Sequence, residues 1–317
     1  VQRGLAVARE RDLLRGEVAR LRSGPIIGNS RGISRVADQI RRVASTPRTT
    51  VLVTGEPGVG KELVARAIHE QSARSGGPFV ALNCAVRSQE RLEAELFGHV
   101  PGALGGADSQ GSGGLVAAAE GGTLFLDGVG ERGPELQAKL LKVLQDRSFR
   151  RVGGSEEQRS EVRVVASTHR DLAHRVEAGS FREDLFYRLN VLSIDVPPLR
   201  ERREDVPELA LHFLERFRRE LGRDLSGFEP AALEARAAHA WPGNVRELRN
   251  VIERGAMRAS GGEVRLVDLA LEDDPPAAGP AEVGLELESY SLREMEERLI
   301  RRALEDSQGN RSRTARL

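Results

Sequence analysis

The sequence has little cysteine, no net charge and no long hydrophobic run. Its one cysteine, Cys84, excludes a disulfide framework and any zinc site built from cysteines. The longest apolar runs are as short as Leu124-Phe125-Leu126, and this excludes a membrane-spanning segment. The 48 basic residues balance the 48 acidic residues, so global charge does not favour binding to nucleic acid, although a local basic patch stays compatible with it.

What is present indicates a folded protein. Hydrophobic residues make up 39% of the 317 residues, which is enough for a core and excludes wholesale disorder. The length fits two domains with short appendages. The chain begins at Val1, and no charged-then-apolar signal segment follows. We therefore expect a cytoplasmic protein, and a fragment of a longer one.

The first part of the chain is predicted to be helical. Residues 1–24 are rich in arginine and glutamate, with Leu14, Val18 and Leu21 at helical spacing. This pattern predicts a solvated linker helix, and a short coiled coil is the alternative. Residues 33–44 carry apolar side chains along one face of an amphipathic helix.

From residue 51 onward, apolar strand-like runs alternate with helical stretches such as 61–72 and 134–146. Continuous apolar strands separated by helices predict a parallel sheet covered by helices on both faces. After Pro197-Pro198 the pattern is helical only, over residues 204–258, which predicts a second, α-helical subdomain. The predicted strands are 51–54, 79–82, 123–127, 162–167 and 191–196.

A glycine-rich segment follows the first predicted strand and opens the next helix. Its glycines let backbone N–H groups turn onto phosphate oxygens, and the helix N-terminus adds the positive end of its dipole. Lys61 would reach the β- and γ-phosphates of a nucleotide. An ordinary glycine-rich turn is the alternative. The predicted phosphate-binding segment consists of Gly55, Glu56, Pro57, Gly58, Val59, Gly60, Lys61 and Glu62.

A second signal is the apolar strand that ends in Asp127. An acidic residue at this place is typical of a Walker B aspartate, which holds Mg²⁺, usually through water. The alternative is an aspartate that only caps its strand. Behind a phosphate-binding loop, the magnesium interpretation is favoured.

Longer stretches carry a resemblance to a known family. They read GEPGVGKELVARAIH at 55–69, PFVALNCA at 78–85, ELFGH at 95–99, GGTLFLD at 121–127, LQAKLLKVLQ at 136–145, RVGG at 151–154, FREDLFYRLNV at 181–191, PPLRERREDVP at 197–207 and WPGNVRELRNVIER at 241–254. In this order they resemble the central AAA+ domain of sigma-54-dependent transcription activators, the bacterial enhancer-binding proteins. The resemblance covers about residues 25–270. Glutamate after the lysine, as at Glu62, is usual in that family.

The resemblance implies an α/β fold, an AAA+ P-loop NTPase core with a parallel sheet, followed by an α-helical lid subdomain. The tail GNRSRTARL resembles the start of a helix-turn-helix whose recognition helix would lie beyond Leu317. The implied parts are a linker helix from a missing N-terminal domain (1–24), the AAA+ α/β subdomain (25–198), the lid (199–270), a linker (271–288) and an incomplete helix-turn-helix DNA-binding domain (289–317).

The resemblance also implies roles for residues around the nucleotide. Asp127 would position Mg²⁺ and the attacking water. Asn83 would couple the nucleotide state to the loop that binds the sigma factor. Thr168 would lie at the sensor I position, with His169 after it, and Arg246 would be sensor II in the lid. Phosphoryl transfer needs cations around the developing charge and little covalent chemistry, so these roles are physically consistent.

Two arginines are implied to act between subunits. Arg182 and Arg188 match arginines that reach the nucleotide of a neighbour across a ring interface, which would make ATP hydrolysis depend on assembly. The alternative for both is surface pairing with Glu183 and Asp184. The implied partners are ATP and Mg²⁺, further copies of the chain in a hexamer or heptamer, sigma-54 RNA polymerase, and DNA through the full C-terminal domain. No membrane partner is implied.

The sequence departs from the family at two places. The family carries a glutamate directly after the Walker B aspartate, where it orients or activates the hydrolytic water, but this chain has Gly128. Glu131 lies three residues further on. The sigma-contacting loop of the family reads GAFTGA, and here leucine and glycine replace its aromatic residue and its threonine. That loop consists of Gly102, Ala103, Leu104, Gly105, Gly106 and Ala107.

Two functional hypotheses follow. In the first, the chain forms a ring that hydrolyses ATP and remodels sigma-54 RNA polymerase. In the second, it is a nucleotide-switched, DNA-binding regulator with impaired ATPase activity and no remodelling of sigma-54, because both departures affect those two functions. A P-loop enzyme that acts on a small molecule is disfavoured, since the sequence encodes no other substrate pocket.

Overall fold

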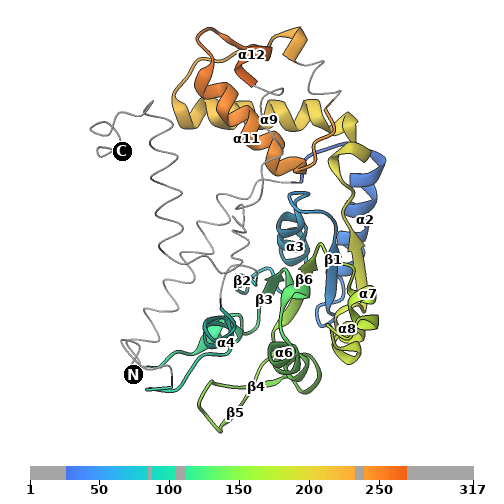
Figure 1. The fold of residues 1–317 in the computed structure, drawn as a ribbon, viewed down its shortest axis with the longest axis vertical. Helices are drawn as coiled ribbons and strands as arrows, with labels where there is room; N and C mark the ends of the chain where they lie inside the picture. The colour runs from blue at the N-terminus through green and yellow to red at the C-terminus, as the bar shows by residue number, and fades with distance from the viewer. Residues whose placement is uncertain (1–25, 85–87, 104–110, 233–238, 270–317) are drawn as a thin grey trace, which may run out of the picture. The chain divides into compact units, whose positions relative to one another are not determined.

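The computed structural model describes residues 26–84, 88–103, 111–232 and 239–269 (Figure 1). Three of the predicted segments therefore lie outside the described residues: the linker helix at 1–24, the linker at 271–288 and the helix-turn-helix at 289–317. The same is true of Leu104, Gly105, Gly106 and Ala107. Within the described part of the chain, no helix has the length and apolar character needed to cross a membrane.

A five-stranded parallel sheet forms the centre of the α/β part, with the strand order β2-β3-β6-β1-β7. Every one of these strands was predicted, and β1 and β3 have the predicted ends. The parallel sheet follows from the apolar runs, because strands buried on both faces need no polar alternation. The strands are β1 (Val51–Thr54), β2 (Phe79–Asn83), β3 (Thr123–Asp127), β6 (Arg163–Thr168) and β7 (Leu192–Asp195).

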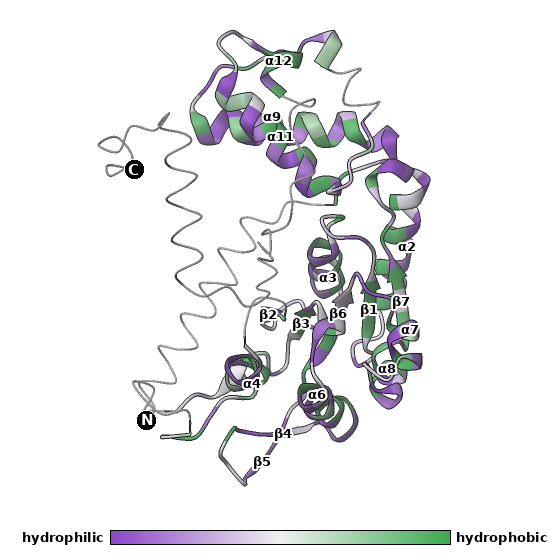
Figure 2. Cartoon of the chain, in the orientation of Figure 1, coloured by the Kyte–Doolittle hydropathy of each residue, from purple (hydrophilic) through white to green (hydrophobic). Residues whose placement is uncertain are grey.

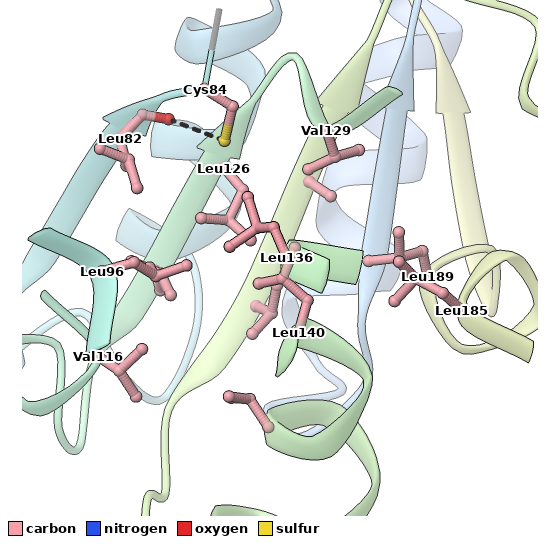
Figure 3. Close-up of a cluster of buried hydrophobic side chains, with 14 of the residues drawn as sticks. Leu82, Cys84, Leu96, Val116, Leu126, Val129, Leu136, Leu140, Leu185 and Leu189 are labelled. Carbon is pink, nitrogen blue, oxygen red and sulfur yellow. Dashed lines mark hydrogen bonds between the residues drawn. The ribbon is translucent and has the colours of Figure 1, made fainter. Parts of the chain in front are cut away.

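Helices cover both faces of the sheet. Leu124 and Leu126 of β3 belong to one buried cluster, whereas Phe125 between them belongs to a cluster on the opposite face. Figure 3 shows Leu126 packed with Leu136 and Leu140 in the first cluster. That cluster includes side chains from α4 (Gln89–Phe97), α5 (Gly114–Ala118), α6 (Pro134–Asp146), α7 (Leu172–Glu177) and α8 (Glu183–Leu189). The opposite cluster includes side chains from α2 (Arg31–Ala44) and α3 (Lys61–Glu70).

The lid has a hydrophobic core of its own, in which Trp241 is fully buried. Two short 3₁₀ turns, η2 (Leu199–Glu201) and η3 (Arg203–Asp205), lead from the sheet into it. The lid helices among the described residues are α9 (Val206–Leu221), α11 (Asn244–Arg258) and α12 (Leu266–Leu269). Asp205, the last residue of η3, joins this region to helix α2. Its carboxylate accepts hydrogen bonds from the backbone N–H and the hydroxyl of Ser30, the residue that caps the start of α2, at 2.8 and 2.6 Å.

The structure corrects the sequence prediction at several points. The lid is not helical only, because β8 (Gly227–Phe228) pairs in parallel with β9 (Glu263–Val264). A hairpin of β4 (Ser148–Arg150) and β5 (Glu157–Arg159) was not predicted, since its strands are short and mostly polar. Helix α3 ends at Glu70 rather than at residue 72. In Figure 2 strand β1 is mostly coloured as hydrophobic, whereas the surrounding helices mix both colours.

Candidate nucleotide-binding site

The predicted phosphate-binding segment forms a tight loop between β1 and α3. Three of its glycines have positive φ: Gly55 at 136°, Gly58 at 82° and Gly60 at 104°. At Gly55 a Cβ atom would lie 2.6 Å from the carbonyl oxygen of Val196, so this position also has no room for a side chain. Helix α3 begins directly after Gly60, at Lys61. The segment therefore has the strand–loop–helix geometry that a phosphate-binding loop requires.

The Lys61 ammonium lies across this loop. Its Nζ donates hydrogen bonds to the carbonyl oxygens of Gly55 and Glu56, at 2.7 and 2.9 Å. Burial lowers the pKa of Lys61, and the charge of Asp127 acts in the opposite direction. The half-buried ammonium thus binds the loop and interacts electrostatically with Asp127.

The carboxyl ends of three neighbouring strands bring polar side chains together. Asp127 ends β3, and in the sheet register it lies opposite Asn83 of β2 and opposite Ser167 of β6. The Ser167 hydroxyl donates a hydrogen bond to the Asp127 carboxylate. Asn83, which the family resemblance connects with the nucleotide state, is thus the direct neighbour of Asp127 in the sheet. Ser167 was missed, and no motif in the sequence marks it.

Asp127 is suited to bind a magnesium ion whose other ligands are phosphate oxygens and water. Among the described residues, no group of three or more His, Cys, Asp or Glu side chains is arranged to hold a metal by itself. Mg²⁺ commonly takes only one or two protein carboxylates and completes its shell with water and substrate phosphates. One carboxylate beside a phosphate-binding loop and a lysine matches that requirement. The protein part of the site would be Asp127.

The segment after Asp127 turns sharply. Gly128 has φ of 79°, and its N–H donates to the carbonyl oxygen of Ser167 at 2.9 Å. The 3₁₀ turn η1 (Val129–Glu131) follows and places the Glu131 carboxylate 3.4 Å from His169 Nε2. Burial lowers the pKa of His169, while the charge of Glu131 opposes that shift. The structure thus places the Glu131 carboxylate beside His169, the residue that follows β6.

The hydroxyl of Thr168 is engaged locally. Its Oγ1 accepts a hydrogen bond from the backbone N–H of Arg170 at 3.0 Å, and the side chain is buried. The neighbouring residue His169 is the one that interacts electrostatically with Lys61 and Asp127. Of these two residues, His169 is thus the one whose pKa responds to the charges of Lys61 and Asp127.

The two arginines implied for the ring interface lie at opposite ends of α8 and are both exposed. The Arg182 guanidinium forms a two-point pair with Asp184, at 3.0 and 2.7 Å, so the surface pairing considered for it is present. The Arg182 backbone N–H donates to Oε1 of the buried Gln137 at 2.8 Å. Gln137 thus fixes the start of α8, a role that no motif in the sequence indicated.

The lid touches the phosphate loop directly. The backbone N–H of Arg246 donates to the Gly58 carbonyl oxygen at 3.3 Å, and the charge of Arg246 contributes to lowering the pKa of Lys61 after the larger effect of burial. Three further lid residues bind the loop, and sequence analysis gave none of them a role. They are Arg200, Arg202 and Asn244.

Backbone hydrogen bonds hold the residues that flank the predicted sigma-contacting loop. His99 pairs with Ser112 through two backbone hydrogen bonds of 3.1 and 2.9 Å, and the N–H of Val100 donates to the carbonyl oxygen of Val152 at 3.0 Å. Gly102 and Ala103 lie in the exposed turn that follows. The RVGG stretch at 151–154 thus binds the segment that precedes the loop, and loop residues 104–107 lie outside the described part of the chain.

Comparison with known proteins finds three family matches along the chain. Residues 26–195 match the family described as Sigma-54 interaction domain, and residues 200–280 match the AAA+ ATPase lid domain. Residues 291–317 match the family described as Bacterial regulatory protein, Fis family.

Characterised relatives agree with these matches. The chain is 49% identical to the Nif-specific regulatory protein of Azotobacter vinelandii over 93% of its length, and 45% identical to the transcriptional regulatory protein ZraR of Escherichia coli K12 over 92%. It spans only 57% and 65% of the length of these two relatives.

Solved structures of NtrX from Brucella abortus, in complex with ADP and with ATP, have a similar fold. Their TM-scores are 0.72 and 0.73 at 38% identity, over 99% of this chain and 71% of NtrX. Together with the AAA+ sheet and the helical lid, these matches show that the chain belongs to the sigma-54 interaction domain family, the sigma-54-dependent AAA+ transcriptional activators.

Proposed function

We propose that the chain binds ATP with Mg²⁺ and hydrolyses it in a hexameric or heptameric ring, and that it uses this energy to remodel sigma-54 RNA polymerase. The observation that carries the proposal is the convergence of Lys61, the phosphate loop and Asp127 at one edge of the parallel sheet. A cation, backbone donors and a magnesium-binding carboxylate are the parts that phosphoryl transfer requires. The ATP and ADP complexes of NtrX support the choice of nucleotide.

The same proposal gives roles to residues on other elements. Arg246 of the lid would bind the phosphates of the same subunit, and Asn83 would pass the nucleotide state to the loop at 102–107. Arg182 and Arg188, exposed on α8, would reach the nucleotide of the next subunit. The match of residues 291–317 to the Fis family supports DNA binding by the full-length protein.

A second function is favoured by one observation, the replacement of the Walker B glutamate by Gly128. Without that carboxylate, the chain would bind ATP, assemble and act as a nucleotide-switched regulator with little turnover. Glu131 is the candidate that would restore hydrolysis, because its carboxylate lies beside His169, which itself interacts with Lys61 and Asp127. The two functions therefore differ in the turnover that they predict, and they agree on nucleotide binding.

Turnover measured beside nucleotide binding separates the two functions. The variants are Gly128→Glu, which restores the carboxylate, and Gly128→Ala, which carries the same backbone strain at φ of 79° without a carboxylate. We expect the wild type to hydrolyse ATP and Glu131→Gln to bind ATP with most of its turnover lost. If only Gly128→Glu turns over while Gly128→Ala and the wild type bind ATP without hydrolysis, the switch is the correct function.

A further inference from the structure

The Glu56 side chain projects from the phosphate loop to the lid. The Arg200 guanidinium pairs with both oxygens of its carboxylate, with Nη1 to Oε2 at 2.7 Å and Nη2 to Oε1 at 2.6 Å. Asn244 donates a third hydrogen bond to Oε2 at 3.0 Å. Arg200 and Asn244 lie 144 and 188 residues after Glu56, in η2 and at the start of α11. The lid thus holds an acidic residue that belongs to the loop.

Asn244 is held in one orientation. It is fully buried and has φ of 56°, a left-handed conformation that asparagine tolerates better than most residues. Its Oδ1 accepts from the backbone N–H of Leu199 at 2.7 Å, and its Nδ2 also donates to the Pro57 carbonyl oxygen at 3.1 Å. Because both ends of the amide are used, Asn244 links η2, the start of α11 and the phosphate loop at a single point.

The negative charge of Glu56 is unfavourable in a loop that binds phosphates. A carboxylate among the backbone donors repels a polyphosphate unless a cation neutralises it or turns it away. The hydrogen bonds from Arg200 and then Asn244 lower the pKa of Glu56, so the carboxylate is ionised at neutral pH. Its geometry turns it to the lid, and the guanidinium supplies the matching charge.

We propose that Arg200 and Asn244 form a lid latch, which neutralises Glu56 and holds it away from the phosphates, so that the docked lid raises the affinity of the loop for a nucleoside triphosphate. Arg200 and Asn244 are positioning residues, since they act on the nucleotide through Glu56. This inference rests on the proposed binding of ATP at the same loop. It adds a role for the lid that is separate from that of Arg246.

Rescue by a second substitution tests the latch. The affinity of the full 317-residue chain for a fluorescent ATP analogue with Mg²⁺ would be measured by titration for Arg200→Gln, Glu56→Gln and the double variant. Arg200→Gln leaves the Glu56 charge unpaired, and we expect its affinity to fall by about threefold to tenfold, the size for one charge near phosphates in a partly exposed site. Glu56→Gln removes the charge that needs pairing, so the double variant should recover wild-type affinity to within about twofold.

Asn244→Asp provides an independent variant. It has the same shape and tolerates the same backbone conformation, but it sets a second carboxylate against Glu56. Its affinity should fall, and Glu56→Gln should restore part of the loss. The matched control is Arg219→Gln, which removes an exposed arginine of the lid that pairs with Glu215 at 2.9 Å, and it should leave the affinity unchanged.

The outcomes distinguish the latch from the proposed function. If the wild type binds the analogue and Arg200→Gln binds it with the same affinity, the latch alone is overturned. A double variant as weak as Arg200→Gln would also overturn it, because Arg200 would then act on the nucleotide without Glu56. A wild type that does not bind the analogue would overturn the proposed function and the latch with it.

Discussion

Replacing Gly58 by alanine should force the phosphate loop away from the lid. A Cβ atom at Gly58 would lie 2.3 Å from the carbonyl oxygen of Gly243 and 3.1 Å from Cβ of Arg246. Neither atom is the end of a flexible side chain, so relief of the clash requires a backbone shift. The φ of 82° adds strain of its own, because residues with a Cβ atom disfavour the left-handed region.

Gly222 provides a control that separates strain from clash. Its φ is 62°, and a Cβ atom there would meet no heavy atom within 4 Å. Alanine at either position should cost about 1–2 kcal/mol for the left-handed backbone. At Gly58 we expect about 1–3 kcal/mol more, as for other over-packed sites. Each kcal/mol lowers the melting temperature by about 2–4 °C in a protein of this size.

Thermal unfolding followed by circular dichroism, without nucleotide, measures both variants. Gly58→Ala should melt at least about 2 °C below Gly222→Ala, or it should show two transitions as the lid separates from the sheet. Equal melting temperatures with one transition in both variants would refute the contact between the loop and the lid, and with it the geometry of the latch.

Three further predictions concern single residues. Burial lowers the pKa of His69 from 6.5 to about 4, so the folded state binds fewer protons in that window, and stability should fall by up to about 3 kcal/mol as the pH drops from 6.5 to 4. Urea unfolding should show a shallower fall for His69→Gln, and identical slopes would contradict the assignment. Burial raises the pKa of Cys84 to about 12, so the native protein should react with a thiol reagent at pH 8 far more slowly than the unfolded chain; equal rates would contradict its burial. Lys61→Ala should lose ATP binding in a titration while it still unfolds in a cooperative transition, and unchanged affinity would count against the phosphate site.

The α/β part was predictable because its signals are local. The apolar runs gave β1 and β3 their ends, and α6 begins at Pro134, a residue that favours the first helical position. The glycines between β1 and α3 indicated the loop, because positive φ at these positions excludes most other residues. Each of these signals lies within about fifteen residues of chain.

The contacts that complete the site carry no such signal. The pairing of Glu56 with Arg200 joins residues 144 positions apart, and both look like ordinary surface charges in the sequence. Ser167 also has no local signal, because its contact with Asp127 depends on the register of β3 against β6. The β8–β9 pair joins two strands of two residues each, too short to show a period. These features come from the tertiary fold.

The most direct test of the proposed ATPase is steady-state turnover of the full chain, measured over a range of protein concentrations. Assembly-dependent hydrolysis predicts that turnover per subunit rises with concentration, and that adding an excess of Arg182→Ala to the wild type lowers it by placing defective arginines beside intact sites. A chain that binds ATP but hydrolyses none at any concentration would contradict the account, and it would identify the protein as a nucleotide-switched regulator.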